Sequence, residues 1–445
     1  MKRITVFFLS LLIVAAILPS CANNEPPDTG YTVNPASDVT DTETVSYETG
    51  DIITQQTEET TKKTDGGTVT LPSDRNGYKE RTAKVTSAVF KSVHQRVGSD
   101  VRDIIIFCET EPNSTVYVCD KYNKVLRCER ANGQFFYTAL PLGEGETMKI
   151  SIYAKADGKS LSNAVKLTLE HTDSIGENVF CGKDSRIFLN WYDDHYYGRV
   201  ASSEEDLDIA VMMMRKNLEQ ARELTGKNTK MIVLVATNPA VIYHDRQYDE
   251  PFGRGDCLAE TSSTLLAKRL EGDPDLYFID CRDVLLAHRD EDIFYQTDSH
   301  WNHLGAYYGY LKMMDYVHKD FPDAPVAELT KYNIWHDYRI SDLMTGSFLN
   351  GAEIGMKEYA LYIMQTPVSR VVNESSPTMY YVGDSYTGLI NIFFLDSFAE
   401  VTTNELYDYS FYNIKRLKPD YLVYVFTERN LDAQASIVWA QTTFN

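Results

Sequence analysis

Hydrophobic and polar positions follow four successive patterns along the 445 residues of this chain. A basic start and an apolar run come first, and a long polar stretch follows them. Short β-branched and aromatic runs then alternate with turn residues, and beyond them segments with helical spacing alternate with apolar runs. The pattern therefore predicts four regions, at 1–20, 21–75, 76–172 and 173–445.

Strand-like runs dominate region 76–172. Several of them alternate in polarity, and Asn, Gly and Asp residues separate them. We expect strands at 83–90, 104–108, 115–119, 125–128, 135–140, 148–154 and 165–169. Runs of this spacing predict a small all-β sandwich of the immunoglobulin or fibronectin type. Such a module is either a spacer or a carbohydrate-binding domain, and we favour the spacer because most sandwiches carry no chemistry of their own.

Helical and strand patterns alternate in region 173–445. Residues 203–224 place apolar side chains on one helical face, and Ser202 with Glu205 fits a capping box at its start. We expect further helices at 262–270, 303–318 and 412–417, and strands at 231–236, 276–279, 379–382 and 421–426. This order predicts an α/β fold of flavodoxin-like type, an open parallel sheet covered by helices. Ligands of such sheets bind at the carboxyl ends of the strands.

The first two regions indicate export and tethering. A basic pair precedes a fifteen-residue apolar stretch, which is short for a membrane span and typical of a secretory signal. The segment 18–21 reads Leu-Pro-Ser-Cys and resembles a bacterial lipobox, so we expect cleavage before Cys21 and a lipid on its thiol. The alternative is a free cysteine beside an ordinary cleavage site. Residues 22–75 include 13 Thr and predict a disordered linker with a reach on the order of 40 Å.

The charge of the chain bears on its binding partners, and its cysteine content bears on disulfide bonds. The chain has 43 Lys and Arg against 64 Asp and Glu, a net charge of −21, and cleavage before Cys21 would leave 41 against 64, or −23. Because the sequence has no basic run, we expect no nucleic-acid partner. Six further cysteines remain, of which Cys119 and Cys128 flank a predicted hairpin turn. These two either form a disulfide or stay as buried thiols.

A serine follows the predicted strand at 379–382. The strand runs into Gly383-Asp384-Ser385, and an apolar segment comes after it. A serine at a strand-to-helix turn raises its hydroxyl at the edge of the sheet, and backbone amides of the next residues, here from Tyr386 onward, point where an oxyanion forms. Ser385 is therefore our candidate nucleophile. The alternative is an ordinary Gly-Asp-Ser turn.

A histidine and an aspartate precede the predicted helix at 303–318. In an extended segment Asp298 and His300 point to the same side, and Asn302 is a good helix cap. A serine needs a base to remove its proton, and the base needs a partner that fixes its tautomer. His300 and Asp298 fit these two roles. The alternatives are a structural histidine or a metal site with His303, which lacks an obvious third ligand, so we expect neither a metal nor a cofactor.

Taken together, these two clusters resemble the SGNH hydrolase superfamily. Here Asp-x-His precedes Gly-Asp-Ser, which reverses the usual order and is similar to the alginate O-acetyltransferase (AlgX/AlgJ-like) branch, also described by its Asp-His-His-Trp motif. Segments 182–188, 341–344 and 418–431 match further motifs of that branch. The resemblance covers about 270 residues. It implies that Ser385 accepts the acyl group and that His300 and Asp298 complete the triad.

Some positions depart from that family pattern, and for others the sequence allows two roles. Ser299 occupies a variable position, and we expect it to point away from Asp298 and His300. The segment 237–243 lacks the lysine that often precedes the family's tyrosine, here Tyr243, so substrate contacts there are in doubt. In the same segment Asn238 either donates to the oxyanion or forms a turn. We also expect two tryptophans near the substrate. Trp301 would shape the pocket, and Trp191 would stack on a sugar or pack against the sheet.

The resemblance implies an O-acetyltransferase that modifies hydroxyls of a cell-surface or exported polysaccharide, and the lipobox-like segment adds an extracytoplasmic, lipid-anchored location. It also implies a membrane-bound partner that supplies acetyl groups. The acidity of the chain weakly disfavours a strongly anionic acceptor such as alginate. Two alternatives stay open: a carbohydrate or acetyl esterase with the same triad, and a non-catalytic polysaccharide-binding assembly protein.

Overall fold

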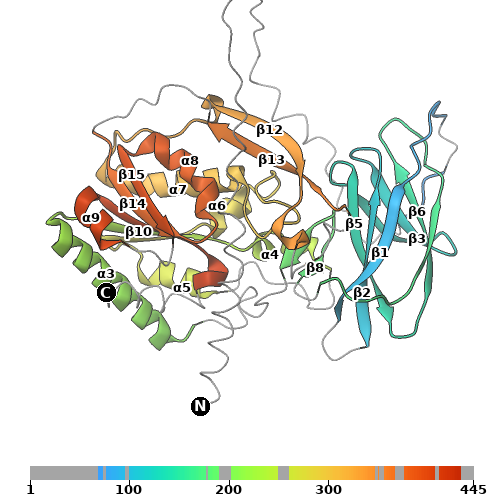
Figure 1. Cartoon of the computed structure of the whole chain (residues 1–445), viewed down its shortest axis with the longest axis horizontal. Coiled ribbons are helices and arrows are strands. Elements are labelled where there is room, and N and C mark those ends of the chain that lie inside the picture. The colour runs from blue at the N-terminus through green and yellow to red at the C-terminus, as the bar shows by residue number, and fades with distance from the viewer. Residues whose placement is uncertain are drawn as a thin grey trace, which may run out of the picture. The chain divides into compact units, whose positions relative to one another are not determined.

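The computed structural model describes most of the chain beyond the predicted linker (Figure 1). The described residues are 69–73, 77–95, 100–176, 179–189, 202–248, 260–345, 349, 355–365, 375–405 and 410–431. They lie within one compact unit, Thr68–Asn445. The predicted signal peptide, the lipid site at Cys21, nearly all of the linker, Trp191 and Cys257 lie outside the described residues. None of the described helices has the length and apolar character needed to cross a membrane.

The described part of region 76–172 is all-β. Its strands are β1 (Thr86–Gln95), β2 (Val101–Glu109), β3 (Thr115–Asp120), β4 (Val125–Arg130), β5 (Phe135–Gly143), β6 (Met148–Lys155) and β7 (Val165–Leu169). Each of them overlaps one predicted run. They form two antiparallel sheets, ordered β1-β2-β5 and β4-β3-β6-β7. Inward-facing residues of both sheets share one apolar cluster, which includes Ile104, Val118, Phe136 and Ile152.

A parallel sheet forms the centre of the α/β region. Its described strands are β10 (Lys230–Ala236), β11 (Leu276–Asp280), β14 (Thr378–Gly383), β15 (Glu400–Glu405) and β16 (Tyr421–Thr427). Their order across the sheet is β11-β10-β16-β14-β15, and every neighbouring pair is parallel. The predicted open parallel sheet is confirmed. The strand β15 and the helix that precedes it were not predicted as separate elements.

The strand order is that of a flavodoxin-like sheet with its chain order permuted. If the strands are numbered from β14 through β16 and then from β10 to β11, the order across the sheet becomes 2-1-3-4-5, which is the flavodoxin-like order. The direction of winding reverses between β14 and β16. Ligands of such folds bind outside the carboxyl ends of the strands at that point, so the fold places a site after β14 and β16.

Helices cover both faces of the parallel sheet. The helices α3 (Glu204–Thr225), α5 (Ser262–Arg269) and α9 (Phe411–Leu417) pack on the face that presents Val233 and Tyr424. The helices α6 (Arg282–Ala287), α7 (His303–Asp320) and α8 (Thr387–Ser397) pack on the face that presents Leu234 and Val425. In Figure 1, α7 and α8 are drawn above the sheet and α3 and α5 below it. Both faces are buried because alternate strand residues point to opposite sides.

Helix starts follow capping chemistry. Asn302 accepts hydrogen bonds from the amides of Leu304 and Gly305 and so begins α7 as predicted. The capping residue of α3 is Ser203 rather than the predicted Ser202. The Ser203 hydroxyl accepts the Asp206 amide, one residue further along than the sequence pattern suggested.

Two hairpins that the sequence pattern did not predict flank the sheet. They are β8 (Val179–Cys181) with β9 (Ile187–Leu189), and β12 (Tyr332–Arg339) with β13 (Glu358–Gln365). The short turn η4 (Asp342–Met344) follows β12, and the short helix α4 (Pro239–Ile242) follows β10. These small elements carry most of the residues that surround the site.

The all-β region packs directly against these small elements. Phe107 and Tyr137 share an apolar cluster with Ile187 of β9 and Met344 of η4. The Asn132 side chain donates to Gln296 Oε1 at 2.7 Å. The Tyr137 amide also donates to the side chain of Ser185 at 3.1 Å. The all-β region therefore supports the segments beside the site, a role that neither the spacer nor the carbohydrate-binding interpretation anticipated.

The described cysteines carry free thiols. They are Cys108, Cys119, Cys128, Cys181 and Cys281. The hairpin predicted between Cys119 and Cys128 is present, with Cys119 opposite Val125 and Cys128 opposite Tyr117. Of the two possibilities for this pair, the structure contains the free thiols.

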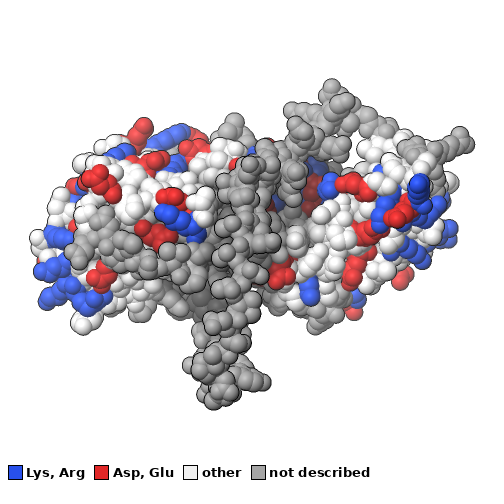
Figure 2. Space-filling view, turned by 90° about the horizontal axis from the view of Figure 1, so that it is seen from above, with Lys and Arg blue, Asp and Glu red and all other residues white. Residues whose placement is uncertain are grey.

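Surface charge is mixed in sign over the described residues. On the face shown in Figure 2, acidic and basic side chains are interspersed over both the all-β and the α/β parts. Neighbouring opposite charges form exposed ion pairs, such as Arg130 with Asp157 and Arg416 with Glu400. The excess of acidic residues is therefore spread over the surface rather than concentrated in one patch of this face.

Candidate active site

The turn after β14 presents Ser385 at the carboxyl edge of the sheet. Gly383 ends the strand where the backbone of β16 comes close, because a Cβ atom there would lie 2.3 Å from the carbonyl oxygen of Val425. The Asp384 amide donates to that same carbonyl at 3.1 Å. Ser385 is exposed. The predicted strand-to-helix turn is therefore present, and α8 begins directly after it.

The Asp384 carboxylate ties this turn to the end of β16. One oxygen accepts the Thr427 amide and the Asn430 side chain, each at 2.7 Å. The other oxygen accepts the Tyr386 amide at 3.0 Å. The Tyr386 amide was predicted to face an oxyanion, but in this structure it serves the turn itself. The site therefore needs another donor for a developing negative charge.

The three residues of the predicted triad meet in one hydrogen-bonded chain. His300 Nε2 lies 2.6 Å from Ser385 Oγ, and His300 Nδ1 lies 2.6 Å from Asp298 Oδ1. The same Asp298 oxygen accepts the backbone amide of His300 at 3.0 Å. With Nδ1 protonated toward Asp298, Nε2 is free to accept the serine proton. This arrangement distinguishes His300 from a histidine with a purely structural role.

The segment that carries Asp298 and His300 is held by several side chains. Glu358 of β13 accepts the amides of Gln296 and Thr297 at 2.7 and 3.0 Å. Ser341 donates to the Thr297 carbonyl at 2.6 Å. From the other side, the Ile187 amide of β9 donates to the Gln296 carbonyl at 2.8 Å. These contacts replace the regular ladder that a strand would have supplied.

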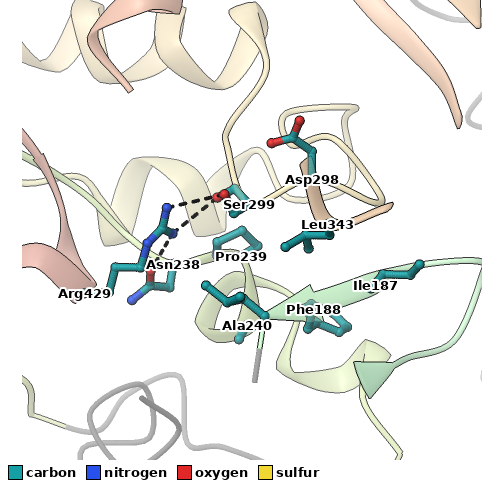
Figure 3. Close-up of a pocket in the computed structure, with 10 residues that line it drawn as sticks. Ile187, Phe188, Asn238, Pro239, Ala240, Asp298, Ser299, Leu343 and Arg429 are labelled. Atoms are coloured by element: carbon teal, nitrogen blue, oxygen red, sulfur yellow. Dashed lines mark hydrogen bonds between the residues drawn. The ribbon is translucent and has the colours of Figure 1, made fainter. Parts of the chain in front are cut away.

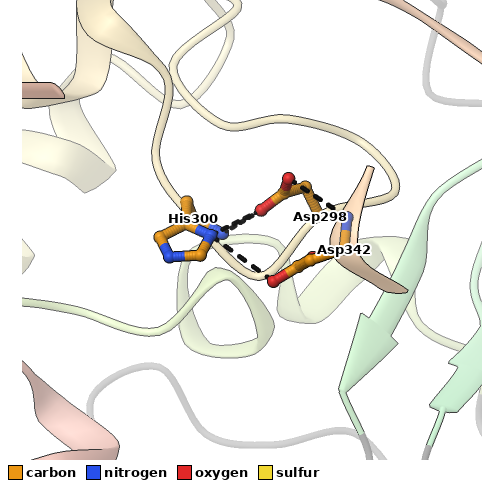
Figure 4. A group of neighbouring side chains, drawn as sticks. All are labelled: Asp298, His300 and Asp342. Carbon is orange, nitrogen blue, oxygen red and sulfur yellow. Dashed lines mark hydrogen bonds and ion pairs between the residues drawn. The ribbon is translucent and has the colours of Figure 1, made fainter. Parts of the chain in front are cut away.

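Two further charged groups lie against the triad. Arg339, at the end of β12, donates to Asp298 Oδ2 at 2.9 Å. Asp342 of η4 brings its Oδ2 to 3.5 Å from His300 Nδ1 (Figure 4). The prediction that Ser299 points away from the triad is wrong. Its hydroxyl donates to Asp342 at 2.6 Å and lies 3.4 Å from His300 Nδ1, because η4 folds back over this segment.

These contacts change the acidity of the groups involved. Burial lowers the pKa of His300, but the charges and hydrogen bonds of Asp298 and Asp342 outweigh burial and raise the pKa to about 10. Burial raises the pKa of Asp342, but hydrogen bonding to His300 and its charge hold that pKa well below the usual range. Burial and the charge of Asp298 raise the pKa of Glu358 to about 7.

Metal binding was the alternative interpretation of this cluster, through His300 and His303. His303 Nδ1 is buried without a hydrogen-bond partner in the described part of the chain, and burial and the charge of Arg339 lower the pKa of His303 to about 4. Asp298, His300 and Asp342 do offer atoms within 4.8 Å of one another. The guanidinium of Arg339 already supplies a positive charge to Asp298, so the arrangement fits proton transfer better than cation binding.

A small pocket adjoins the triad (Figure 3). Asp298, Ser299, Asn238 and Arg429 contribute its polar lining. Arg429, which follows β16, approaches the Ser299 carbonyl and hydroxyl, each at 3.4 Å. The Asn238 side-chain oxygen lies 3.5 Å from Arg429, whereas its Nδ2 is buried and has no partner among the described residues. Asn238, one of the residues that line the pocket, therefore carries an unpaired hydrogen-bond donor.

The predicted aromatic contacts are buried beneath the site. Trp301 has no exposed surface and donates to the Tyr386 carbonyl at 3.1 Å. Tyr386 is also fully buried, and its hydroxyl donates to the Ser299 carbonyl. Tyr243 is 5% exposed and packs under the guanidinium of Arg186. None of the three has a face free to stack on a sugar, so they support the pocket from below, while Trp191 lies outside the described residues.

Sequence reasoning missed the supporting charges. Arg339 and Glu358 lie in the unpredicted hairpin, and no local motif marks them. Asp342 belongs to a segment that matched a family motif, but that match gave it no role. Glu428, in the motif segment 418–431, pairs with buried Arg282 at 2.8 Å.

These features define a class. A parallel α/β sheet with a serine on the turn after one strand, and a histidine and an aspartate on a neighbouring loop, is the arrangement of the SGNH hydrolases. Residues 179–397 match the family model ALGX, described as the SGNH hydrolase-like domain of the acetyltransferase AlgX. This part of the chain is therefore similar to the AlgX/AlgJ-like branch of that superfamily, as its motifs suggested. The curated proteins include no match to this chain.

Several solved structures are similar to this chain. The O-acetyltransferase domain of Pseudomonas putida AlgJ is 15% identical, with a TM-score of 0.43, over 60% of this chain and 99% of that one. Pseudomonas aeruginosa AlgX is 15% identical, with a TM-score of 0.44, over 61% of this chain and 67% of that one. Bacillus cereus PatB1 is 11% identical, with a TM-score of 0.39, over 57% of this chain and 96% of that one.

Proposed function

We propose that this chain is an extracytoplasmic O-acetyltransferase that moves acetyl groups onto hydroxyls of a cell-surface or exported polysaccharide. One observation carries the proposal: Ser385, His300 and Asp298 form a continuous hydrogen-bonded chain. Its setting, a domain that matches the acetyltransferase AlgX, selects acetyl transfer among the reactions such a triad supports.

The proposed reaction has two half-reactions. In the first, His300 Nε2 takes the proton of Ser385 as Oγ attacks the acetyl carbonyl of the donor, and the donor's leaving oxygen then receives that proton from His300. In the second, a sugar hydroxyl gives its proton to His300 and attacks the acetyl-serine ester, after which Ser385 recovers the proton. Asp298 stabilises the imidazolium that forms in each half-reaction.

Asn238 is the donor we propose for the developing oxyanion. Its Nδ2 is buried and unpaired, which is costly unless a ligand uses it. Its orientation is set because its amide donates to Glu428 at 3.3 Å and its side-chain oxygen approaches Arg429. The Tyr386 amide is occupied by Asp384, so Asn238 takes the larger share of this role.

An esterase is the second candidate, and the exposure of Ser385 favours it. Water reaches an exposed hydroxyl, so an acetyl-serine ester there is open to hydrolysis. Transfer requires that a sugar hydroxyl reaches the ester faster than water does. The two candidates share every residue of the triad and differ in the acceptor alone.

The rest of the chain fits a tethered enzyme in this proposal. Residues 1–20 act as a signal peptide, Cys21 carries a lipid, and residues 21–75 form the flexible link to the membrane. The seven-stranded region then serves as an immunoglobulin-like domain that holds the catalytic domain from one side. A membrane-bound partner supplies the acetyl group, because acetyl-coenzyme A is not available outside the cell.

Hydrolysis of 4-nitrophenyl acetate tests the nucleophile. Ser385→Ala is expected to lower the rate by about 10³-fold or more, because the loss of a triad member removes most of the catalysis that the triad provides. Ser203→Ala, at the start of α3, is the matched control and should keep full activity. Equal rates for Ser385→Ala and the unmodified protein would contradict the proposal.

The acceptor is tested by adding an oligosaccharide to the same reaction. Acetylated oligosaccharide in the mass spectrum, absent with Ser385→Ala, would support the transferase. Free acetate alone, at a rate that the oligosaccharide does not change, would favour the esterase.

A further inference from the structure

Two carboxylates face the same nitrogen of His300. Asp298 Oδ1 lies 2.6 Å from Nδ1, and Asp342 Oδ2 lies 3.5 Å from it (Figure 4). The two residues reach His300 from different elements, since Asp298 lies before α7 and Asp342 lies in η4. A triad needs only one such carboxylate, so the second requires its own explanation.

The two carboxylates differ in how their charges are compensated. Asp298 Oδ2 accepts from the guanidinium of Arg339 at 2.9 Å, and both side chains are largely buried. Asp342 is bonded instead to neutral donors, the Ser299 amide at 2.9 Å and the Ser299 hydroxyl at 2.6 Å. Among the described residues, His300 is the group that forms an ion pair with Asp342. Asp342 is therefore the carboxylate whose charge acts on the imidazole without a competing cation.

Other charged and titratable groups around His300 do not change this balance. Arg429, on the β16 side, approaches Ser299 and lies over the Tyr386 ring at 5.3 Å. Tyr386 packs against the His300 ring at 4.9 Å. Glu358 lies behind Arg339, with its Oε1 3.9 Å from the Arg339 Nε. Asp384 is engaged by donors at the end of β16.

We propose that Asp342 is a positioning residue whose negative charge adds to that of Asp298 in stabilising protonated His300, while Asp298, which lies close to Nδ1 and pairs with Arg339, fixes the tautomer. The proposal rests on the proposed function, in which His300 acts as the base. It divides between two residues the work that one aspartate does in a simple triad. Ser299 has a part in this device because both of its donors hold the Asp342 carboxylate in place.

The test compares Asp342→Asn with Asp337→Asn in the full chain. Asp337 is an exposed aspartate of β12, so it provides the same change of charge at the surface. An NMR titration of the His300 ring gives its pKa without any need for activity. In Asp342→Asn the pKa should fall by about 1 to 3 pH units, the range for removal of an opposite charge at this distance. Asp337→Asn should leave the pKa unchanged.

The pH profile of kcat/KM for 4-nitrophenyl acetate gives the second readout. In Asp342→Asn the inflection should move to lower pH with the pKa of His300, and the plateau should fall by about 10- to 100-fold because the imidazolium is less stabilised. KM should change little, since Asp342 is not among the residues that line the pocket. A folded Asp342→Asn protein with an unchanged His300 titration and an unchanged plateau would overturn the proposal.

Asp342→Glu keeps the charge and provides a variant that does not depend on the behaviour of the Asn form. Its His300 should retain a raised pKa, and its plateau should fall only a few-fold because the carboxylate has moved. A pKa that drops as it does in Asp342→Asn would show that charge is not the cause. Failure of the proposed function appears separately, as an unmodified protein whose rate equals that of Ser385→Ala while the titration still responds to Asp342→Asn.

Discussion

The two halves of the triad are built in different ways. Ser385 sits on the parallel sheet, where the backbone fixes it: Gly383 lies against β16, and Asp384 ties the turn to the end of that strand. His300 and Asp298 sit on an irregular loop whose position depends on side chains from β9, β13 and η4. Ser385 is therefore held by the fold itself, and His300 is held by a network of polar contacts.

This difference affects how substitutions change the free energy of unfolding and the pKa values of the buried groups. A backbone-built turn loses stability and activity together when it is disturbed, because the strand must move. A loop built from carboxylates and their donors changes its acidity with each substitution, because the charges are buried and close to one another. We therefore expect substitutions on the two sides to separate stability from proton transfer.

Asp298→Asn should give the largest fall in activity, and it changes only the loop that carries His300. Arg339 needs an acceptor, so the asparagine oxygen will face Arg339 and its NH2 group will face His300 Nδ1. The histidine proton then moves to Nε2, where it blocks acceptance of the serine proton. We expect kcat for 4-nitrophenyl acetate to fall by about 10³- to 10⁴-fold, with an unfolding midpoint within a few degrees of the unmodified protein. More than a tenth of the activity remaining would contradict this account.

Gly383→Ala should give the next largest effect and disturb the side of the nucleophile. The new Cβ would lie 2.3 Å from the Val425 carbonyl oxygen and 2.4 Å from Thr387 Cγ2. We expect the free energy of unfolding to fall by about 1 to 3 kcal/mol and the activity to fall with it, as measured by urea titration and by the ester assay.

Gly388→Ala is the matched control for that variant. A Cβ atom at Gly388 meets no atom within 4 Å, and alanine favours a helix over glycine by about 1 kcal/mol. Stability should therefore hold or rise. If both glycine variants lost stability equally, the close contact with β16 would not be the cause.

Glu358→Gln should give the smallest effect, visible as a change in pH dependence. The pKa of Glu358 is raised to about 7 in the folded chain, so the folded state binds more protons than the unfolded state between pH 4.5 and 7. Stability therefore falls as pH rises through this window. The unfolding midpoint should decline less over the window in Glu358→Gln. An equal decline in both proteins would remove Glu358 as a contributor.

The sequence predicted the elements and residues that carry local signals. Ser385 follows an apolar strand and a glycine, and Asp298 with His300 precedes the capping residue Asn302, so neighbouring positions define each of them. The strands of the all-β region and the described strands of the parallel sheet other than β15 were predicted for the same reason. Their residues alternate in polarity or form short apolar runs between turn residues.

The remainder depends on contacts between distant segments. Arg339 reaches Asp298 from 41 positions away, and β12, which carries it, has a middle exposed on both faces, so it lacks the alternation that marks a strand. Tyr243 was listed for substrate contact because it matches a tyrosine of the family segment, and Trp301 because it lies beside His300. Their burial follows from the packing of α7 and α4 on the sheet, which no local pattern reveals.

The position of β16 has a consequence for the order in which the chain folds during synthesis. Of the described strands of its sheet, β16 is synthesised last, yet it forms the bridge between β10 and β14. Until it emerges, β10–β11 and β14–β15 are two ribbons without a shared edge, and Asp384 lacks the anchors that follow β16. A nascent or translocating chain that has already produced Ser385 and His300 therefore still lacks an assembled triad. Insertion of one strand completes the fold and the chemistry in the same step.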